Sequence, residues 1–269
     1  MLKYLRLVFT ALPKICWLYF GYIVRYARHP EKYPLEKRYK KVHELFVVIC
    51  DHLRIDWKIK GLENIRDLEK KGQVFLLVPN HLSVLDTIQI LYWCEKPVSV
   101  VSKKENLKLP VIGKVLKAID SYHLDRNDLR DGVRMIQYVS KRLSEGSQSF
   151  MIFPEGTRNK NPKGPLNEFH PGSFKSLYKS GVPMIPLAQY GSQFPLSFST
   201  NYKRYPMYLT FFKPIVKEEY SKYSAVEFAP IVEEIIAKEV YSLRALGDNY
   251  FLMKEENIPL KGKKAISIQ

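Results

Sequence analysis

The segment VFLLVPNHLSVLD, residues 74–86, passes from an unbroken apolar run into a polar turn and then into a pattern with helical spacing. An apolar run of this length bounded by a turn is typical of a buried strand, here Val74–Val78. The residues that follow predict a helix over Ser83–Cys94. A strand that leads through a short turn into a helix is the basic unit of an α/β fold.

The same alternation of short apolar runs and helical patterns continues along the chain. It predicts further strands at residues 98–102, 122–124, 149–153, 184–189 and 208–212, and further helices at residues 110–119, 128–145, 173–179 and 225–244. We therefore expect an α/β fold in which a central mixed sheet is flanked by helices on both faces.

The composition indicates an anionic partner. Among 269 residues, 43 lysines and arginines stand against 27 acidic residues, which gives a net charge of +16. A surplus of this size points to nucleic acid, a lipid headgroup surface or phosphorylated substrates. The sequence has no zinc-finger spacing, RNA-binding signature or basic leucine-zipper pattern, so we do not expect a nucleic-acid partner. Its three cysteines are scattered and predict neither a disulfide framework nor a metal site.

Residues 2–28 are hydrophobic and unusually rich in aromatic side chains. A cleaved signal peptide is excluded because the apolar stretch runs into Arg-Tyr-Ala-Arg rather than a small-residue cleavage site. Lys14 divides the segment, and the uncharged run Ile15–Val24 would rise only about 15 Å as a helix, half of the ~30 Å hydrocarbon core. This favours an amphipathic or half-inserted helix in one leaflet. A transmembrane span and a helix packed on the soluble core are the alternatives.

A second helix is predicted over residues 36–54, where apolar side chains recur at helical spacing. Such a stripe usually packs on a core, and here it could also join the first helix in a membrane anchor. We expect three parts: a two-helix membrane anchor at residues 1–56, an α/β catalytic domain at residues 57–250 and a loose basic tail at residues 251–269.

His81 and Asp86 carry the first candidate chemistry. Five positions apart on one helix, their side chains would point about 140° away from each other. They can meet only if His81 lies in the turn and Asp86 on the helix behind it. Asp86 would then orient the imidazole of a general base. The alternative is that His81 caps the strand end and Asp86 favours the helix N-terminus. No third ligand suggests a metal, and no Gly-x-Ser-x-Gly motif suggests a serine triad.

A second polar turn follows the predicted strand in SFMIFPEGTRN, residues 149–159. It presents Glu155, Gly156, Thr157 and Arg158 in succession, with the backbone exposed at the glycine. The planar guanidinium of Arg158 suits phosphate oxygens. The alternative is a charged turn with an internal ion pair between Glu155 and Arg158, which would contribute little to stability.

Together, Asn-His81-x4-Asp86 and Phe-Pro-Glu155-Gly-Thr-Arg158 resemble the glycerolipid acyltransferase superfamily, most closely its bacterial-type 1-acylglycerol-3-phosphate (lysophosphatidic acid) acyltransferases. The resemblance covers residues 57–215. Lys103-Lys104-Glu105 and the segment that ends at Arg126 resemble the phosphate-binding block of the family. Gly181-Val-Pro183-Met-Ile-Pro186 resembles the block on the acyl-donor side.

The resemblance implies a role for each matching residue. His81 would be the general base and Asp86 its orienter. The acceptor's phosphate and glycerol would be bound by Lys104, Arg126, Glu155, Gly156, Thr157 and Arg158, and Pro183 and Pro186 would shape the acyl-donor side. The transition-state oxyanion would be held by a backbone N–H near the Glu-Gly-Thr turn.

The implied reaction moves a fatty acyl group from an acyl thioester to the sn-2 hydroxyl of lysophosphatidic acid and gives phosphatidic acid. The donor would be acyl-CoA, acyl carrier protein or acyl phosphate, with no cofactor or metal. The enzyme would work on membrane lipids with its catalytic domain facing the cytoplasm. The alternatives are an acyltransferase for another lysophospholipid or for glycerol 3-phosphate, and a non-catalytic basic membrane-binding protein.

Overall fold

The computed structural model describes residues 10–196 and 204–253, and within these ranges the strands form one seven-stranded sheet. The strand order is β1-β7-β6-β2-β5-β3-β4. All neighbouring strands are parallel except β6 and β7, which are antiparallel. The predicted mixed α/β sheet is thus confirmed. The strands are β1 (Ile55–Lys60), β2 (Leu76–Pro79), β3 (Val98–Lys103), β4 (Tyr122–Leu124), β5 (Ser149–Met151), β6 (Met184–Tyr190) and β7 (Tyr205–Phe211).

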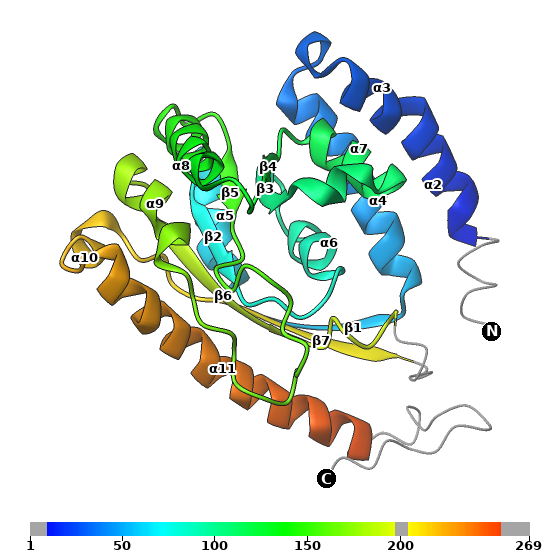
Figure 1. Cartoon of the computed structure of the whole chain (residues 1–269). Helices are drawn as coiled ribbons and strands as arrows, with labels where there is room; N and C mark the ends of the chain where they lie inside the picture. The colour runs from blue at the N-terminus through cyan, green and yellow to red at the C-terminus, as the bar shows by residue number, and fades with distance from the viewer. Residues whose placement is uncertain (1–9, 197–203, 254–269) are drawn as a thin grey trace.

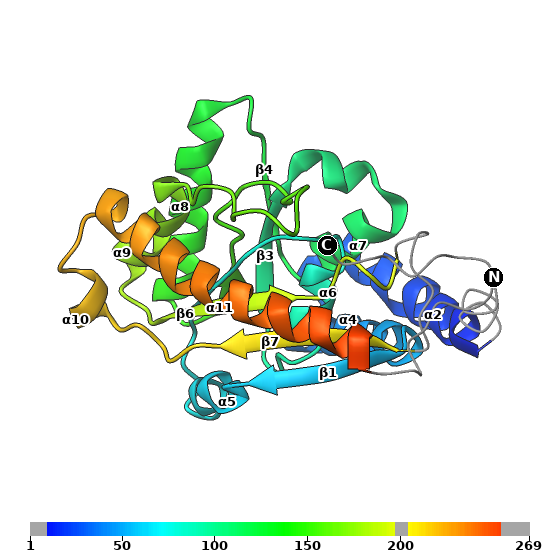
Figure 2. The same ribbon diagram turned by 90° about the horizontal axis from the view of Figure 1, so that it is seen from below.

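Helices cover both faces of the sheet (Figure 1). One face carries α4 (Leu35–His52), α5 (Leu62–Lys70), α6 (Asp86–Leu91) and α7 (Pro110–Ala118), and the other carries α8 (Leu129–Ser144), α9 (Lys175–Ser180), α10 (Lys217–Tyr220) and α11 (Ala225–Met253). Figure 2 shows α11 lying across β6 and β7. Successive strand residues enter different cores: Leu76 packs with the α8–α11 side and Leu77 with the α4–α7 side.

The described residues also contain three short 3₁₀ segments. They are η3 (Pro30–Lys32), η4 (Lys104–Lys108) and η5 (Pro171–Phe174). Segment η4 turns the end of β3 into α7, and Gly113 makes this turn possible. A Cβ on Gly113 would lie 2.4 Å from the carbonyl oxygen of Leu107. The glycine therefore lets α7 pack directly on the segment before it.

The N-terminal region forms a nearly continuous helical rod from α2 (Leu12–Leu18) through the π-helical η2 (Tyr19–Ile23) to α3 (Val24–Arg28). One side of the rod is buried at Leu18, Ile23 and Tyr26, in the same core as α4 and α7. No helix in residues 10–196 and 204–253 is both long and apolar enough to span a bilayer. The expectations for residues 1–9 and for most of the basic tail, residues 254–269, lie outside the described residues.

Hydrogen bonds as well as apolar packing join this N-terminal region to the α/β domain. The hydroxyl of Tyr19 donates a 2.6 Å hydrogen bond to the carbonyl oxygen of Pro110. The buried guanidinium of Arg38, on α4, donates two 2.7 Å hydrogen bonds to the carboxylate of Asp120. The same guanidinium donates to the carbonyl oxygens of Tyr33 and Ala118, so its donors are well satisfied.

Candidate active site

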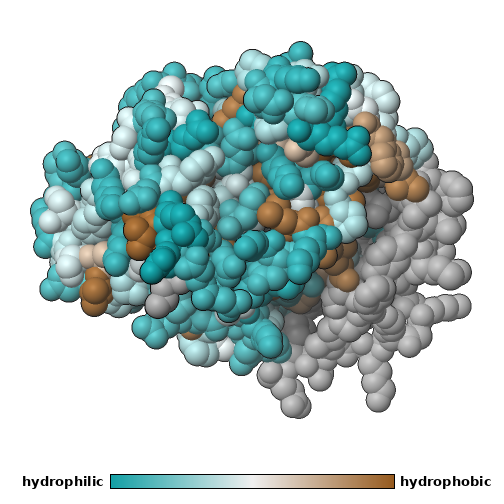
Figure 3. Space-filling view, turned by 45° about the horizontal axis from the view of Figure 1, so that its top comes forward, coloured by the Kyte–Doolittle hydropathy of each residue, from teal (hydrophilic) through white to brown (hydrophobic). Residues whose placement is uncertain are grey.

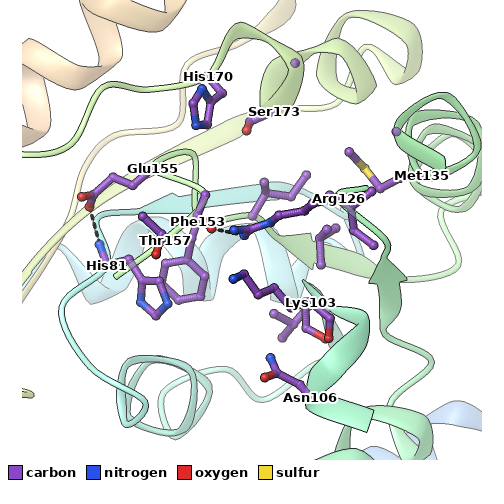
Figure 4. A pocket seen from close by; sticks show the side chains of 18 of the residues that line it. His81, Lys103, Asn106, Arg126, Met135, Phe153, Glu155, Thr157, His170 and Ser173 are labelled. Carbon is purple, nitrogen blue, oxygen red and sulfur yellow. Dashed lines mark hydrogen bonds between the residues drawn. The ribbon is translucent and has the colours of Figure 1, made fainter. Parts of the chain in front are cut away.

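A cavity of about 510 Å³ opens where β2, β3, β4 and β5 reach their carboxyl ends (Figure 4). This edge of a parallel sheet is the usual position of ligands in open α/β folds. The cavity wall includes most of the residues selected from the sequence and several others. It contains His81, Arg126, Glu155, Gly156, Thr157 and Arg158, and also Lys103, Met135, Phe153, His170 and Ser173.

His81 and Asp86 form the hydrogen bond that the turn-then-helix argument predicts. Nδ1 of His81 lies 2.7 Å from Oδ2 of Asp86, with the carboxylate fully buried and the imidazole 19% exposed. Because a carboxylate oxygen can only accept, Nδ1 carries the proton and Nε2 is left as the acceptor. The ring of Phe153 stacks on the imidazole at a centroid distance of 4.1 Å and limits its rotation.

Asp86 is itself held by the turn that it closes. Its Oδ2 also accepts hydrogen bonds from the backbone amides of Leu82, at 2.6 Å, and Ser83, at 2.9 Å. The carboxylate lies at the first position of α6, where the positive end of the helix dipole favours its charge. Asp86 therefore both begins the helix and holds the imidazole of His81, two roles that the sequence offered as alternatives.

Asn80, just before His81, fixes the end of β2 to β6. Its amide exchanges three hydrogen bonds with Gln189: Asn80 Nδ2 donates to the Gln189 carbonyl oxygen at 3.1 Å, the Gln189 N–H donates to Asn80 Oδ1 at 2.8 Å, and Gln189 Nε2 donates to the Asn80 carbonyl oxygen at 2.7 Å. Both side chains are fully buried. The position of His81 at the cavity therefore depends on a strand that comes more than a hundred residues later in the chain.

Glu155 connects the two polar turns. Its Oε1 accepts a 2.6 Å hydrogen bond from the backbone amide of His81, and its Oε2 accepts a 3.0 Å bond from the amide of Asn167. The side chain is 2% exposed, and this burial raises the pKa of its carboxyl group to about 7. Between the side chains that the structure describes, no ion pair joins Glu155 to Arg158, so the alternative of a simple charged turn does not hold.

Positive side chains surround the cavity, but not all of those selected from the sequence. Arg126 reaches in from beyond β4, and its Nη2 donates to the carbonyl oxygen of Gly156 (Figure 4). Arg158 is exposed at the rim. Of the two neighbouring lysines, Lys103 lines the cavity, whereas Lys104 points elsewhere and forms a 3.2 Å ion pair with Asp125.

Of the two prolines expected on the acyl-donor side, Pro183 lies directly before β6 and Pro186 lies within it, and neither lines the cavity. The carbonyl oxygen of Pro183 accepts a hydrogen bond from Leu76, and that of Pro186 accepts one from Phe212. Both are buried, which gives them a structural place beside β2. Across residues 10–196 and 204–253, no three His, Cys, Asp or Glu side chains gather in a way that could hold a metal ion.

Comparisons with known proteins agree with this geometry. Residues 56–190 match the family model described as Acyltransferase. A probable 1-acyl-sn-glycerol-3-phosphate acyltransferase of Mycoplasma pneumoniae is 31% identical over 62% of this chain and 61% of its own length. A 1-acyl-sn-glycerol-3-phosphate acyltransferase of Borreliella burgdorferi is 30% identical over 50% and 51% of the two chains. The matching region thus spans about three fifths or less of the length of these relatives.

A solved structure shares the fold over nearly its whole length. The crystal structure of the 1-acyl-sn-glycerophosphate (LPA) acyltransferase PlsC from Thermotoga maritima superposes with a TM-score of 0.65 at 25% identity. The superposition covers 91% of this chain and 95% of that one. With a family model that matches half of its residues, the chain belongs to the acyltransferase family.

Proposed function

We propose that the protein is a 1-acylglycerol-3-phosphate O-acyltransferase, which transfers a fatty acyl group to the sn-2 hydroxyl of lysophosphatidic acid. One observation carries the proposal: the His81–Asp86 hydrogen bond of 2.7 Å faces a cavity that is also lined by Lys103, Arg126 and Arg158. A general base beside a cluster of cations suits an acceptor that carries both a hydroxyl and a phosphate. The names of the similar proteins point to the same reaction.

In the proposed reaction, Nε2 of His81 takes the proton of the acceptor hydroxyl. The oxygen forms a bond to the carbonyl carbon of the donor, the carbon–sulfur bond breaks, and the thiolate leaves with the proton that His81 returns. Asp86 stabilises the imidazolium through Nδ1, and its two backbone donors keep it in place. The acyl group passes directly between substrates, so no serine nucleophile is needed.

The backbone amides in and beside the Glu-Gly-Thr turn differ in whether they are free to bind the transition-state oxyanion. The amides of Gly156 and Thr157 already donate to the carbonyl oxygens of Phe153 and Glu155, and the amide of Asn159 donates to that of His81. The amide of Arg158 has no such bond to any residue that the structure describes. We therefore assign the oxyanion donor to the backbone N–H of Arg158.

Substrate contacts follow from the cavity wall. Lys103, Arg126 and Arg158 would bind the phosphate of the acceptor, and Thr157 would reach its glycerol, while Glu155 acts by holding the backbone of His81. As proposed, the donor is an acyl thioester, such as acyl-CoA or acyl carrier protein, or an acyl phosphate. The reaction uses no cofactor or metal.

Attachment to a membrane is part of the proposal. The rod α2–η2–α3 exposes Leu12, Trp17 and Phe20, and Leu109 and Val111 at the start of α7 are exposed as well. The Tyr19–Pro110 hydrogen bond places these two groups next to each other. Figure 3 shows apolar side chains at the right of the view, the side on which Figure 1 places α2 and α7.

Such a surface suits insertion into one leaflet, with aromatic rings at headgroup depth and the surplus of cations near anionic lipids. Residues 1–56 would then form the anchor, residues 57–250 the catalytic domain, and residues 251–269 a basic tail. The catalytic domain would face the cytoplasm, where acyl thioesters are made.

The test is an assay of the full chain with a labelled acyl donor and a panel of acceptors in vesicles: lysophosphatidic acid, other lysophospholipids and glycerol 3-phosphate. Preferential formation of phosphatidic acid from lysophosphatidic acid supports the proposal. Preference for another acceptor would identify a different acyltransferase. Vesicle binding without any acyl transfer would identify a non-catalytic membrane-binding protein.

A further inference from the structure

His170 is a cavity residue to which neither the sequence motifs nor the proposed reaction assigns a task. It follows the loop after β5 and immediately precedes η5, and its ring lies on the opposite side of the cavity from His81 (Figure 4). Its backbone is fixed, because its N–H donates to Pro154 and its carbonyl oxygen accepts from Ser173, each at 3.0 Å. Its ring, by contrast, has no hydrogen-bond partner among the residues that the structure describes. A rigid backbone therefore presents a free imidazole to the cavity.

Gly156 places this imidazole next to Arg126. If Gly156 had a Cβ atom, it would lie 3.3 Å from Nε2 of His170 and 3.9 Å from Nη2 of Arg126. Because the two distances share this Cβ position as an end point, the two nitrogens lie at most 7.2 Å apart. Gly156 has φ = +65°, a backbone conformation that favours glycine. The glycine therefore keeps side-chain atoms away from the region next to both nitrogens.

A phosphate group is large enough to contact both nitrogens from the cavity. Each charge-assisted N–H···O bond measures about 2.8 Å, so two oxygens of one phosphate can bridge nitrogens up to about 8 Å apart. Nη2 of Arg126 already donates to the carbonyl oxygen of Gly156, which aims the guanidinium along the cavity wall while its other N–H groups stay available. The neighbouring cations Lys103 and Arg158 add to the positive potential.

We propose that His170 is a specificity-determining residue that, together with Arg126, bridges the phosphate monoester of the acceptor across Gly156. This inference rests on the proposed function and names the part of the acceptor that is recognised. Nε2–H of His170 donates to one terminal oxygen and Arg126 to another. A phosphodiester keeps two terminal oxygens but carries only one negative charge, and its substituent needs room next to the pair. The pair therefore favours lysophosphatidic acid over lysophospholipids with a headgroup.

The test compares His170→Leu with His170→Gln in the full chain. Glutamine can present an N–H donor near the position of Nε2, and leucine cannot. Since a hydrogen bond to a charged group changes binding by about tenfold or more, we expect His170→Leu to raise KM for lysophosphatidic acid at least about tenfold. KM for the acyl donor should stay unchanged, and His170→Gln should recover most of the loss. The preference of His170→Leu for lysophosphatidic acid over lysophosphatidylcholine should fall along with this rise in KM.

Glycerol 3-phosphate provides a second readout that does not depend on membrane insertion. As a soluble competitor it should inhibit the wild type and His170→Gln more strongly than His170→Leu. His29→Leu is the matched control, because this imidazole is exposed on the segment before α4, away from the cavity. Far-ultraviolet circular dichroism checks folding, and His170→Ala replaces His170→Leu if the latter does not fold.

The outcomes separate this inference from the proposed function. A wild type that acylates no phosphate-bearing acceptor would overturn the proposed function. An active wild type whose His170→Leu variant keeps its KM for lysophosphatidic acid would overturn only the role of His170. The same holds for a fall in kcat at unchanged KM, which would place the ring at the chemistry, and for equal losses in His170→Leu and His170→Gln, which would indicate packing.

Discussion

The carboxylate of Glu155 accepts a 2.6 Å hydrogen bond from the backbone amide of His81, although 74 positions separate the two residues. Each polar turn is thus positioned by the other: one turn supplies the base, and the other holds the backbone from which the base projects. The carbonyl oxygen of His81 accepts a return hydrogen bond from Asn159 at 2.8 Å. The two motifs form one unit, and substitutions in either should affect the same step.

Replacing the base should stop the reaction while leaving the fold intact. His81→Ala removes the proton acceptor, and a positioned general base contributes about 10²–10⁴-fold to the rate. Asp86→Asn should also be severely impaired, because an amide can donate to Nδ1 and so favour the wrong tautomer. The measurement is kcat of the purified variants, with circular dichroism as the control. Turnover close to that of the wild type in His81→Ala would refute the mechanism.

Glu155 should make stability depend on pH. Burial raises the pKa of its carboxyl group from the ordinary 4.5 to about 7, so the folded state binds this proton more tightly than the unfolded state. Its contribution is complete below pH 4.5 and is lost as the pH rises through 7. The free energy of unfolding should therefore fall over this window, relative to Glu155→Gln, by on the order of 3 kcal/mol. Urea unfolding at several pH values measures the difference. Parallel pH profiles for the two proteins would contradict the raised pKa.

The two neighbouring lysines should differ in their effect on acceptor use. Lys103 lines the cavity, whereas Lys104 is ion-paired with Asp125. We expect Lys103→Ala and Arg158→Ala to raise KM for lysophosphatidic acid by about tenfold or more while leaving KM for the donor unchanged. Lys104→Ala serves as the matched control, because it removes the same charge one residue away. If the two lysine variants lose equal activity, the cations act through the overall potential and not through contact.

The exposed face of the N-terminal rod should bind vesicles. Trp17→Glu combined with Phe20→Glu places two charges where we expect lipid tails, and sedimentation with anionic vesicles should fall sharply. Val226→Glu is the control, because Val226 is equally exposed but lies on α11, on the other face of the sheet. Burial of apolar surface contributes about 25 cal/mol per Å² to membrane binding. High salt should therefore not release the wild type from vesicles, whereas detergent should. Unchanged sedimentation of the double variant would place the membrane contact elsewhere.

Most strands are predictable from sequence as short apolar runs, including the partly exposed edge strand β4. Strands β2 and β6 are buried along their whole length and appear as continuous apolar runs. Strand β1 was not predicted, because it is an edge strand with partly exposed residues and a high proportion of charged side chains. Helix α6 is shorter than the predicted helix, since residues 83–85 form the turn that binds Asp86.

In the candidate site, too, some features were predictable from the sequence and others were not. The contact between His81 and Asp86 follows from local chain geometry, and so it was predictable. The choice between Lys103 and Lys104 depends on the position at which β3 turns into η4, which the sequence pattern does not specify. His170 enters the cavity at the end of a long loop, and its neighbours Gly156 and Arg126 are brought to it only by the tertiary fold. Residue type alone gave no signal for it.

The pairing of β1 with β7 has a consequence for how the protein is made. Ile55 is in register with Tyr205, so the first strand to leave the ribosome pairs with one synthesised 150 residues later. At about 5–20 residues per second, β1 waits roughly 8 to 30 seconds for β7, its one neighbour among the described strands. During this interval the nascent chain displays an unpaired strand directly after α4. A chain interrupted before residue 205 would keep that edge open, and such fragments should be prone to aggregation and to capture by chaperones.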